Sequence, residues 1–115
     1  MNDSLYPRMS AEISKQQRDL VPAPYAAFRD FSKQVFAPGA LDAKTKQLIA
    51  VAAAHVTQCP YCIAGHTKAA LQAGASHQQI MEAIWVAAEM HAGAAYAHSA
   101  IAIHAMEEAE AAGKA

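Results

Sequence analysis

The alanine content of this chain limits its fold more than any other feature of the sequence. Thirty of the 115 residues are alanine and only eight are aromatic. No stretch alternates apolar and polar side chains over the length that a half-buried strand requires. Such a composition suits helices that pack closely through small side chains, but it supplies little bulk for a core. We therefore expect an all-α bundle of five to six helices that associates with copies of itself.

Length and charge narrow the class of protein further. The 115 residues suit a single domain over 1–115, with a flexible N-terminus at 1–9. A net charge of −1 offers no basic patch for nucleic acid. The longest apolar run, 48–54, is far shorter than the roughly 20 residues of a membrane span, and no signal peptide is visible at the N-terminus. We expect a cytoplasmic protein with no nucleic-acid partner and no membrane partner.

Capping residues, prolines and apolar periodicity divide the chain into helices. Ser10 is expected to cap the first helix, Gly74 to end the fourth, and Ser76 with Gln79 to form a capping box at the start of the fifth. Ile49 is expected to be buried with its apolar neighbours in the third helix. The second of these helices carries an aromatic stripe, from Tyr25 through Phe28 and Phe31 to Phe36, which we expect to pack in a core. The last helix is longer than globular helices usually are, so we expect a break near Gly93. The expected helices cover 11–20, about 24–36, 43–56, 60–73 and 77–111.

The two cysteines of the chain, Cys59 and Cys62, are separated by only two residues. Cys59 is placed as the N-cap of a helix and Pro60 as its first residue, where a missing N–H is no loss. Unpaired N–H groups and the helix dipole at such an end favour a thiolate. His66 lies four residues after Cys62 on the same face. The pattern predicts a dithiol that closes to a disulfide.

Two other interpretations compete with redox chemistry. Free cysteines are often simply buried as small apolar residues. Cys59, Cys62 and His66 also supply three potential zinc ligands. Structural zinc normally takes a fourth ligand, and no second pair of Cys or His residues follows at suitable spacing. We therefore expect redox chemistry and no metal.

Two segments, QLIAV at 47–51 and CPYCIAGHTKAALQAG at 59–74, resemble the core motif of the AhpD-like, carboxymuconolactone decarboxylase family. The resemblance covers about residues 20–108. It implies an all-α fold that assembles as a trimer or as a hexamer built from dimers. It also implies a peroxidase-type antioxidant enzyme that reduces organic hydroperoxides through a dithiol–disulfide cycle. No bound cofactor is implied, and an external dithiol such as a lipoyl group, free or on a carrier protein, would reduce the disulfide again.

The resemblance also implies a role for each residue of the motif. By the family pattern Cys62 reacts with the peroxide and is paired with His66, while Cys59 resolves the intermediate. The residues by themselves leave this order open. Cys59 at the helix cap is expected to be the more exposed sulfur, whereas Cys62 has the imidazole within reach.

Two positions depart from the family pattern. Twelve residues before Cys59, where family members carry a glutamate that accepts a proton, this chain has Gln47. Tyr61 stands between the cysteines, where some members have a histidine. An amide takes no proton at neutral pH, so we expect His55 to replace the carboxylate as proton acceptor. The alternative is that His55 binds the last carbonyls of its own helix, and Gln47 then keeps a hydrogen-bonding role.

Two further functions remain open beside hydroperoxide reduction. One is a non-catalytic redox-sensing or thiol–disulfide module, in which the disulfide alters packing between subunits. The other is lactone decarboxylation, the activity that gives the family its name. Decarboxylase members do not depend on the cysteine pair, so the pair disfavours that reading.

Overall fold

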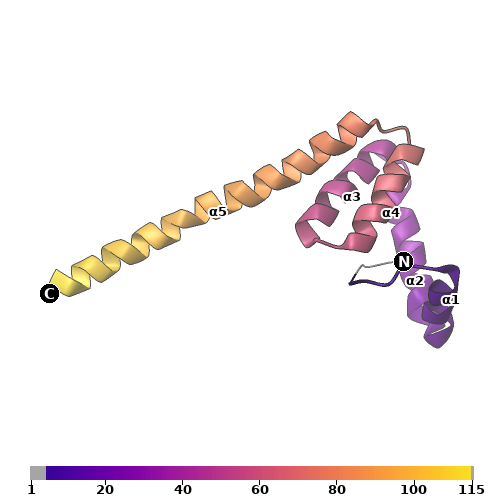
Figure 1. The fold of residues 1–115 in the computed structure, drawn as a ribbon, viewed down its shortest axis with the longest axis horizontal. Coiled ribbons are helices and arrows are strands. Elements are labelled where there is room, and N and C mark those ends of the chain that lie inside the picture. Colours follow the sequence, from indigo (N-terminus) through magenta and orange to yellow (C-terminus); the bar gives the residue numbers. More distant parts are fainter. Residues whose placement is uncertain (1–4, 115) are drawn as a thin grey trace. The chain divides into compact units, whose positions relative to one another are not determined.

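The structure is a computed structural model that describes residues 5–114, and this part of the chain forms five helices and no strand (Figure 1). The predicted all-α class is confirmed. The helices group into two units, one up to Lys46 and one from Gln47 onward. The five helices are α1 (Ala11–Leu20), α2 (Pro22–Phe36), α3 (Ala43–Thr57), α4 (Pro60–Gln72) and α5 (His77–Lys114).

Helices α1 and α2 belong to the first unit. The Ser10 hydroxyl caps α1 by accepting a hydrogen bond from the Ile13 N–H at 3.1 Å. Helix α2 begins at Pro22 and not at Pro24, because proline suits the first turn of a helix and needs no hydrogen-bond partner there. Of the segment 1–9 that was predicted to be flexible, residues 5–9 lie outside any helix and the rest lies outside the described residues.

The prediction that the aromatic stripe of α2 packs in a core is wrong for the single chain. Phe28 is 66% exposed and Phe31 is 62% exposed. Their rings contact each other, with centroids 6.4 Å apart, and Arg29 lies 6.0 Å from the centroid of the Tyr25 ring. Neither α1 nor α2 has a buried residue, so these two helices form no core that the stripe could join.

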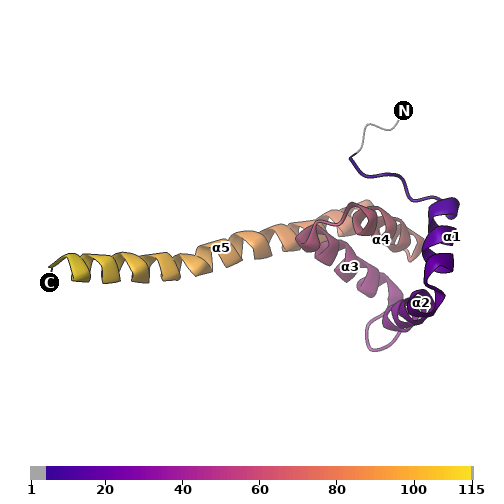
Figure 2. The same ribbon diagram turned by 90° about the horizontal axis from the view of Figure 1, so that it is seen from below.

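The second unit contains a small apolar core. Val51 of α3 and Ala70 of α4 are fully buried, and Ala75 and Ile80 complete the cluster at the start of α5. Helices α3 and α4 lie side by side in both views (Figures 1 and 2). The expectation that Ile49 would be buried with its neighbours in α3 is wrong, because its side chain is 53% exposed.

Helices α3 and α4 end in the same way, with one residue in the left-handed conformation. Gly74 has φ 97° after α4, and the N–H groups of Gly74 and Ala75 donate to the carbonyls of Leu71 and Ala70. This pair of bonds is a Schellman motif, and it confirms the predicted stop at Gly74. After α3 the left-handed residue is Gln58, with φ 57°.

Helix α5 starts with the predicted capping box and continues without a break. Ser76 Oγ accepts from the Gln79 N–H at 3.0 Å, and Gln79 Oε1 accepts from the Ser76 N–H at 2.9 Å. The predicted break near Gly93 is wrong, because α5 runs through 38 residues to Lys114. An interior glycine costs a helix only about 1 kcal/mol, and the alanines around Gly93 are strong helix formers.

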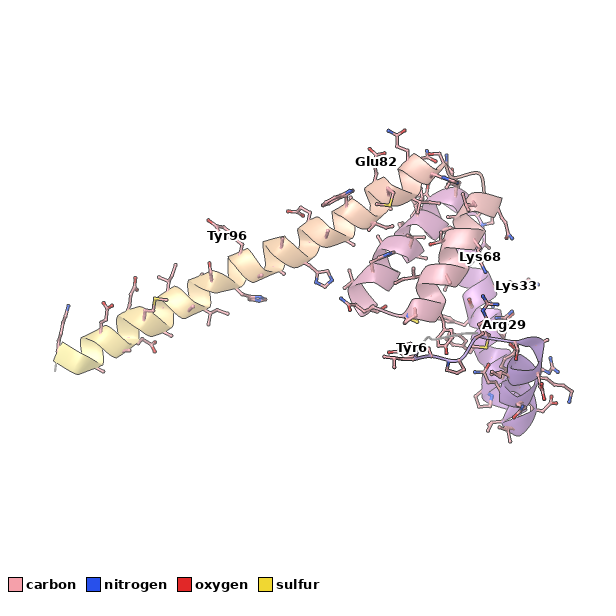
Figure 3. The ribbon with its side chains drawn as sticks, viewed as in Figure 1. Tyr6, Arg29, Lys33, Lys68, Glu82 and Tyr96 are labelled. Carbon is pink, nitrogen blue, oxygen red and sulfur yellow. The ribbon has the colours of Figure 1, made fainter. Side chains whose placement is uncertain are left out.

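The second half of α5 has no cover from the rest of its own unit. After Ala87 every described residue is exposed except Gly93, which is partly buried. Tyr96, labelled in Figure 3, is 82% exposed, and Ile101 is 67% exposed. No helix within residues 5–114 combines the length and hydropathy needed to cross a bilayer.

Candidate active site

The backbone of Cys59 is fixed on both sides by the two helices that it joins. Its N–H donates to the Ala54 carbonyl of α3 at 3.2 Å, and its carbonyl accepts from the Ile63 N–H of α4 at 2.9 Å. The residue is the N-cap of α4, followed by Pro60 at the first helical position. The predicted placement of Cys59 at the start of a helix is therefore confirmed.

The two cysteines are joined by a hydrogen bond from the backbone of one to the sulfur of the other. Cys59 Sγ accepts from the Cys62 N–H at 3.3 Å, and both cysteines are free and partly buried. The pKa of the Cys59 thiol is lowered by the hydrogen bond from the Cys62 thiol and then by the N–H groups of Cys62 and Tyr61. The pKa of Cys62 is raised by the same thiol–thiol bond, by partial burial and by the charge on Cys59. The pair is therefore polarised, in that a negative charge is favoured on Cys59 over Cys62.

Gln47 and His66 come together from α3 and α4. His66 Nδ1 lies 2.8 Å from Gln47 Oε1. An amide oxygen only accepts, so Nδ1 carries the proton and donates it to this bond. In the neutral ring the lone pair then lies on Nε2. Gln47 thus orients the imidazole and fixes its tautomer without adding a charge.

His55 makes its hydrogen bond within α3. Its Nδ1 lies 2.7 Å from the Val51 carbonyl oxygen, four residues earlier. The bond stays within α3, as in the alternative to proton transfer, but it goes to an interior carbonyl one turn back and not to the last carbonyls of the helix. Among the described residues His55 has no hydrogen bond to either sulfur. The Val51 carbonyl holds the proton on Nδ1, so Nε2 of the neutral ring is the nitrogen that can accept one.

Tyr61 lies between the cysteines with a side chain that is 37% exposed. Its backbone N–H is one of the groups that lower the pKa of Cys59. In the part of the chain that the structure describes, no three His, Cys, Asp or Glu side chains gather closely enough to hold a metal ion.

Gln58 contributes to the site in a way that the sequence did not reveal. Because Gln58 adopts φ 57°, the chain turns back at the end of α3 and the Cys59 N–H reaches the Ala54 carbonyl. A glycine at this position would have signalled the turn, but glutamine carries no such signal.

Residues 22–105 match the carboxymuconolactone decarboxylase family. The chain belongs to this family. Uncharacterized protein 4 of the cox locus of Paracoccus denitrificans is 56% identical over 108 residues, which cover 94% of this chain and 96% of the relative. An uncharacterized protein of Cupriavidus necator is 39% identical over 83 residues, covering 70% of this chain and 74% of its own.

Solved structures of carboxymuconolactone decarboxylase family proteins share the fold. One from Legionella pneumophila superposes with a TM-score of 0.64 at 33% identity, covering 69% of this chain and 70% of its own. A second, from Thermotoga maritima, is described as having a possible involvement in an antioxidative response. It superposes with a TM-score of 0.53 at 38% identity, covering 56% of this chain and 66% of its own.

Proposed function

We propose that this protein is a thiol-dependent peroxidase that reduces organic hydroperoxides through a Cys59–Cys62 dithiol–disulfide cycle. The polarised pair of free cysteines at the N-terminus of α4 is the observation that carries the proposal. A thiolate is the nucleophilic form of cysteine, and a second thiol next to it is what a resolving step requires. Membership of the family and the description of the Thermotoga maritima relative agree with this chemistry.

The cycle has three steps, each balanced in atoms and electrons. One thiolate attacks the terminal peroxide oxygen, so that an S–O bond forms, the O–O bond breaks and the leaving alkoxide takes a proton to become an alcohol. The second sulfur then displaces water from the sulfenic acid and closes the disulfide. Finally an external dithiol, such as a reduced lipoyl group, passes two electrons and two protons to the disulfide. A reducing compartment such as the cytoplasm suits this cycle.

This chain has Gln47 where family members carry a proton-accepting glutamate, so another group has to accept the proton. His55 is our candidate, because its Nδ1–H is held by the Val51 carbonyl and its Nε2 can accept a proton. His66, oriented by Gln47, is the second imidazole of the site.

Assembly of several copies belongs to the same proposal, as a trimer or as a hexamer built from three dimers. Past Ala87 the apolar side chains of α5 are exposed, and so are Phe28 and Phe31 of α2. A helix in water depends on packing of its apolar face for most of its stability. Other copies of the chain would bury these side chains.

Steady-state consumption of an organic hydroperoxide with a dithiol reductant tests the proposal. The parent protein should turn over, and Cys59→Ser and Cys62→Ser should each abolish turnover, because each removes one partner of the disulfide. His55→Ala should slow turnover by about a hundredfold if the ring is the proton acceptor. Glu110→Gln on the exposed end of α5 is the control and should match the parent.

Three other outcomes would contradict the proposal in different ways. A single oxidation of the protein, with one equivalent of hydroperoxide consumed and no further turnover, would indicate the redox-sensing module. Lactone decarboxylation that survives replacement of both cysteines by serine would indicate the activity for which the family is named. Turnover that persists in either serine variant would show that the disulfide is not part of the cycle.

A further inference from the structure

Helix α5 has an apolar face that its own unit leaves exposed. Ile80 and Ile84 of this helix lie against the small core, and Ala87 is buried. About 90° around the helix from these three residues, a second series repeats at spacings of four and three in turn. It occupies positions 81, 85, 88, 92, 95, 99, 102 and 106, from Met81 to Met106, and all of them are exposed. We call this series the α5 stripe.

The α5 stripe and its border expose enough surface for a stable interface. Trp85 is 69% exposed, and Met81 and Met106 at the two ends of the stripe are each more than half exposed. Tyr96, labelled in Figure 3, and Ile103 lie on the border and are also more than half exposed. These five side chains expose on the order of 600 Å², and a standard interface takes about 800 Å² from each partner. The alanines of the stripe add to this area.

The spacing of the α5 stripe is that of a seam between two helices. Apolar residues that repeat every 3.5 residues on average form such a seam in coiled coils. The middle of the stripe carries only alanine and serine, so two helices can approach closely there. In an antiparallel pair centred between Ala92 and Ala95, Trp85 of each helix lies opposite Ala102 of the other. In a parallel pair in register Trp85 would meet its own copy, whereas the antiparallel pair places large against small.

The charges of α5 favour the same antiparallel arrangement. Glu107, Glu108 and Glu110 lie near the end of the helix, where its own dipole disfavours negative charge. His104 contacts one of them, at 2.9 Å from Nε2 to the Glu108 carboxylate. The first turn of α5 has no acidic residue and forms the positive end of the dipole. An antiparallel pair places this end of each copy beside the glutamates of the other, and a parallel pair would bring the glutamates of both copies together.

From the spacing, the side-chain sizes and the charges, we infer that α5 pairs antiparallel with α5 of a second copy along the α5 stripe. The inference rests on the assembly that belongs to the proposed function and says which surface joins the copies. Such a pair is related by a twofold axis, because the same surface is used on both sides. The assembly then contains an even number of chains, so a hexamer built from dimers fits and a trimer does not.

Disulfide trapping tests the pair and its direction. Both native cysteines are replaced by serine in the full-length chain, and Ala88→Cys and Ser99→Cys are made separately in that background. The antiparallel pair places position 88 of one copy opposite position 99 of the other, so the two variants expressed together should form a covalent dimer on oxidation with diamide. Each variant alone should not, because equivalent positions would lie about 16 Å apart along the helices, too far for a disulfide.

Two matched glutamate substitutions test which face of α5 forms the contact. Ala95→Glu, added to both cysteine variants, places a carboxylate in the middle of the α5 stripe. It should lower the yield of covalent dimer at least about tenfold, since a buried charge without a partner is costly. Ala97→Glu makes the same change at an exposed position two residues further, on the opposite side of the helix, and should leave the yield unchanged.

Several results would overturn the inference. A covalent dimer from either cysteine variant alone would indicate a parallel pair. No covalent dimer from the mixture would mean that the α5 stripe is covered by another part of the chain or left open. Equal losses from Ala95→Glu and Ala97→Glu would place the contact elsewhere on α5. A parent assembly of three chains in light scattering would overturn the antiparallel pair and leave the proposed assembly intact, and hydroperoxide turnover by the parent tests the peroxidase separately.

Discussion

At the scale of single residues, hydrogen bonds shift the pKa of each cysteine of the site and set the tautomer of each histidine. The Cys62 thiol and N–H lower the pKa of Cys59, and Cys59 in turn raises the pKa of Cys62. Gln47 fixes the tautomer of His66, and Val51 does the same for His55. These bonds join thiol, amide, imidazole and carbonyl groups.

Restoring the family glutamate is the first prediction at this scale. Gln47→Glu should raise the rate of hydroperoxide reduction by roughly tenfold or more, because a carboxylate on His66 Nδ1 makes the imidazole a better proton acceptor. Stopped-flow kinetics with excess dithiol would measure it. The gain should vanish in Gln47→Glu/His66→Ala. A gain that survives in the double variant would show that the carboxylate acts without the imidazole.

The pH dependence of Cys62 alkylation is the second prediction. In the parent the pKa of Cys62 is raised, first by the bond to the Cys59 thiol and further by the charge on Cys59. Cys59→Ser removes the thiol and the charge, so the pKa of Cys62 should fall. Its alkylation should then begin at lower pH than in the parent. Rates of iodoacetamide labelling across the alkaline range would show the shift. An unchanged profile would mean that Cys59 does not influence its neighbour.

At the scale of the helices, the ends of α3 and α4 determine where the site residues lie. Each helix is followed by a left-handed residue, Gln58 in one case and Gly74 in the other, and the bonds at Gly74 form a Schellman motif. The turn at Gln58 leads directly into Cys59. The turn at Gly74 leads through Ala75, a member of the small core around Val51 and Ala70, into α5.

Opposite changes in the free energy of unfolding are expected when Gly74 gains a side chain and when Gln58 is replaced by glycine, because both residues are left-handed. Gly74→Ala should lower the free energy of unfolding by about 1 kcal/mol, because a Cβ disfavours this conformation. Gln58→Gly should raise it by a similar amount. Urea unfolding at equal protein concentration would measure both. Gly65→Ala, inside α4 where an added Cβ meets nothing within 4 Å, should be neutral or stabilising.

Equal losses in Gly74→Ala and Gly65→Ala would contradict this account. The left-handed backbone of Gly74 would then have no special cost for a side chain.

Features of the fold and of the site could be predicted from the sequence where the residues that form them are close together in the chain. The helix-end residues lie within a few residues of the groups they bind, and their places at the helix ends were predicted correctly. They are Ser10, Cys59, Gly74 and the Ser76 capping box. Gln58 was missed because glutamine rarely takes a positive φ. The contact between Gln47 and His66 joins two helices, so its geometry became visible only in the structure.

At the scale of the whole molecule, exposed apolar surface is the main feature of the chain. The aromatic stripe of α2 and the second half of α5 were both misjudged from sequence. Apolar periodicity shows that a face is covered, but it does not distinguish cover by the same chain from cover by another copy. An unbroken α5 is consistent with cover by another copy.

Assembly yields the prediction at this scale. Light scattering should give a mass of three or six times the 12.2 kDa of one chain. Ile101→Glu, at a residue that is 67% exposed, should shift the mass toward smaller species, since a buried charge without a partner is costly. Glu110→Gln should leave the mass unchanged. A 12.2 kDa particle in the parent would contradict the prediction.

The central claim is that Cys59 and Cys62 are a working redox pair, and the intact mass of the oxidised protein tests it most directly. Reduced protein would be mixed with one equivalent of an organic hydroperoxide and its mass and peptides analysed. The account predicts the loss of two hydrogens, a Cys59–Cys62 disulfide and one equivalent of alcohol. An unchanged mass, or oxygen added to the sulfurs without a disulfide, would contradict it.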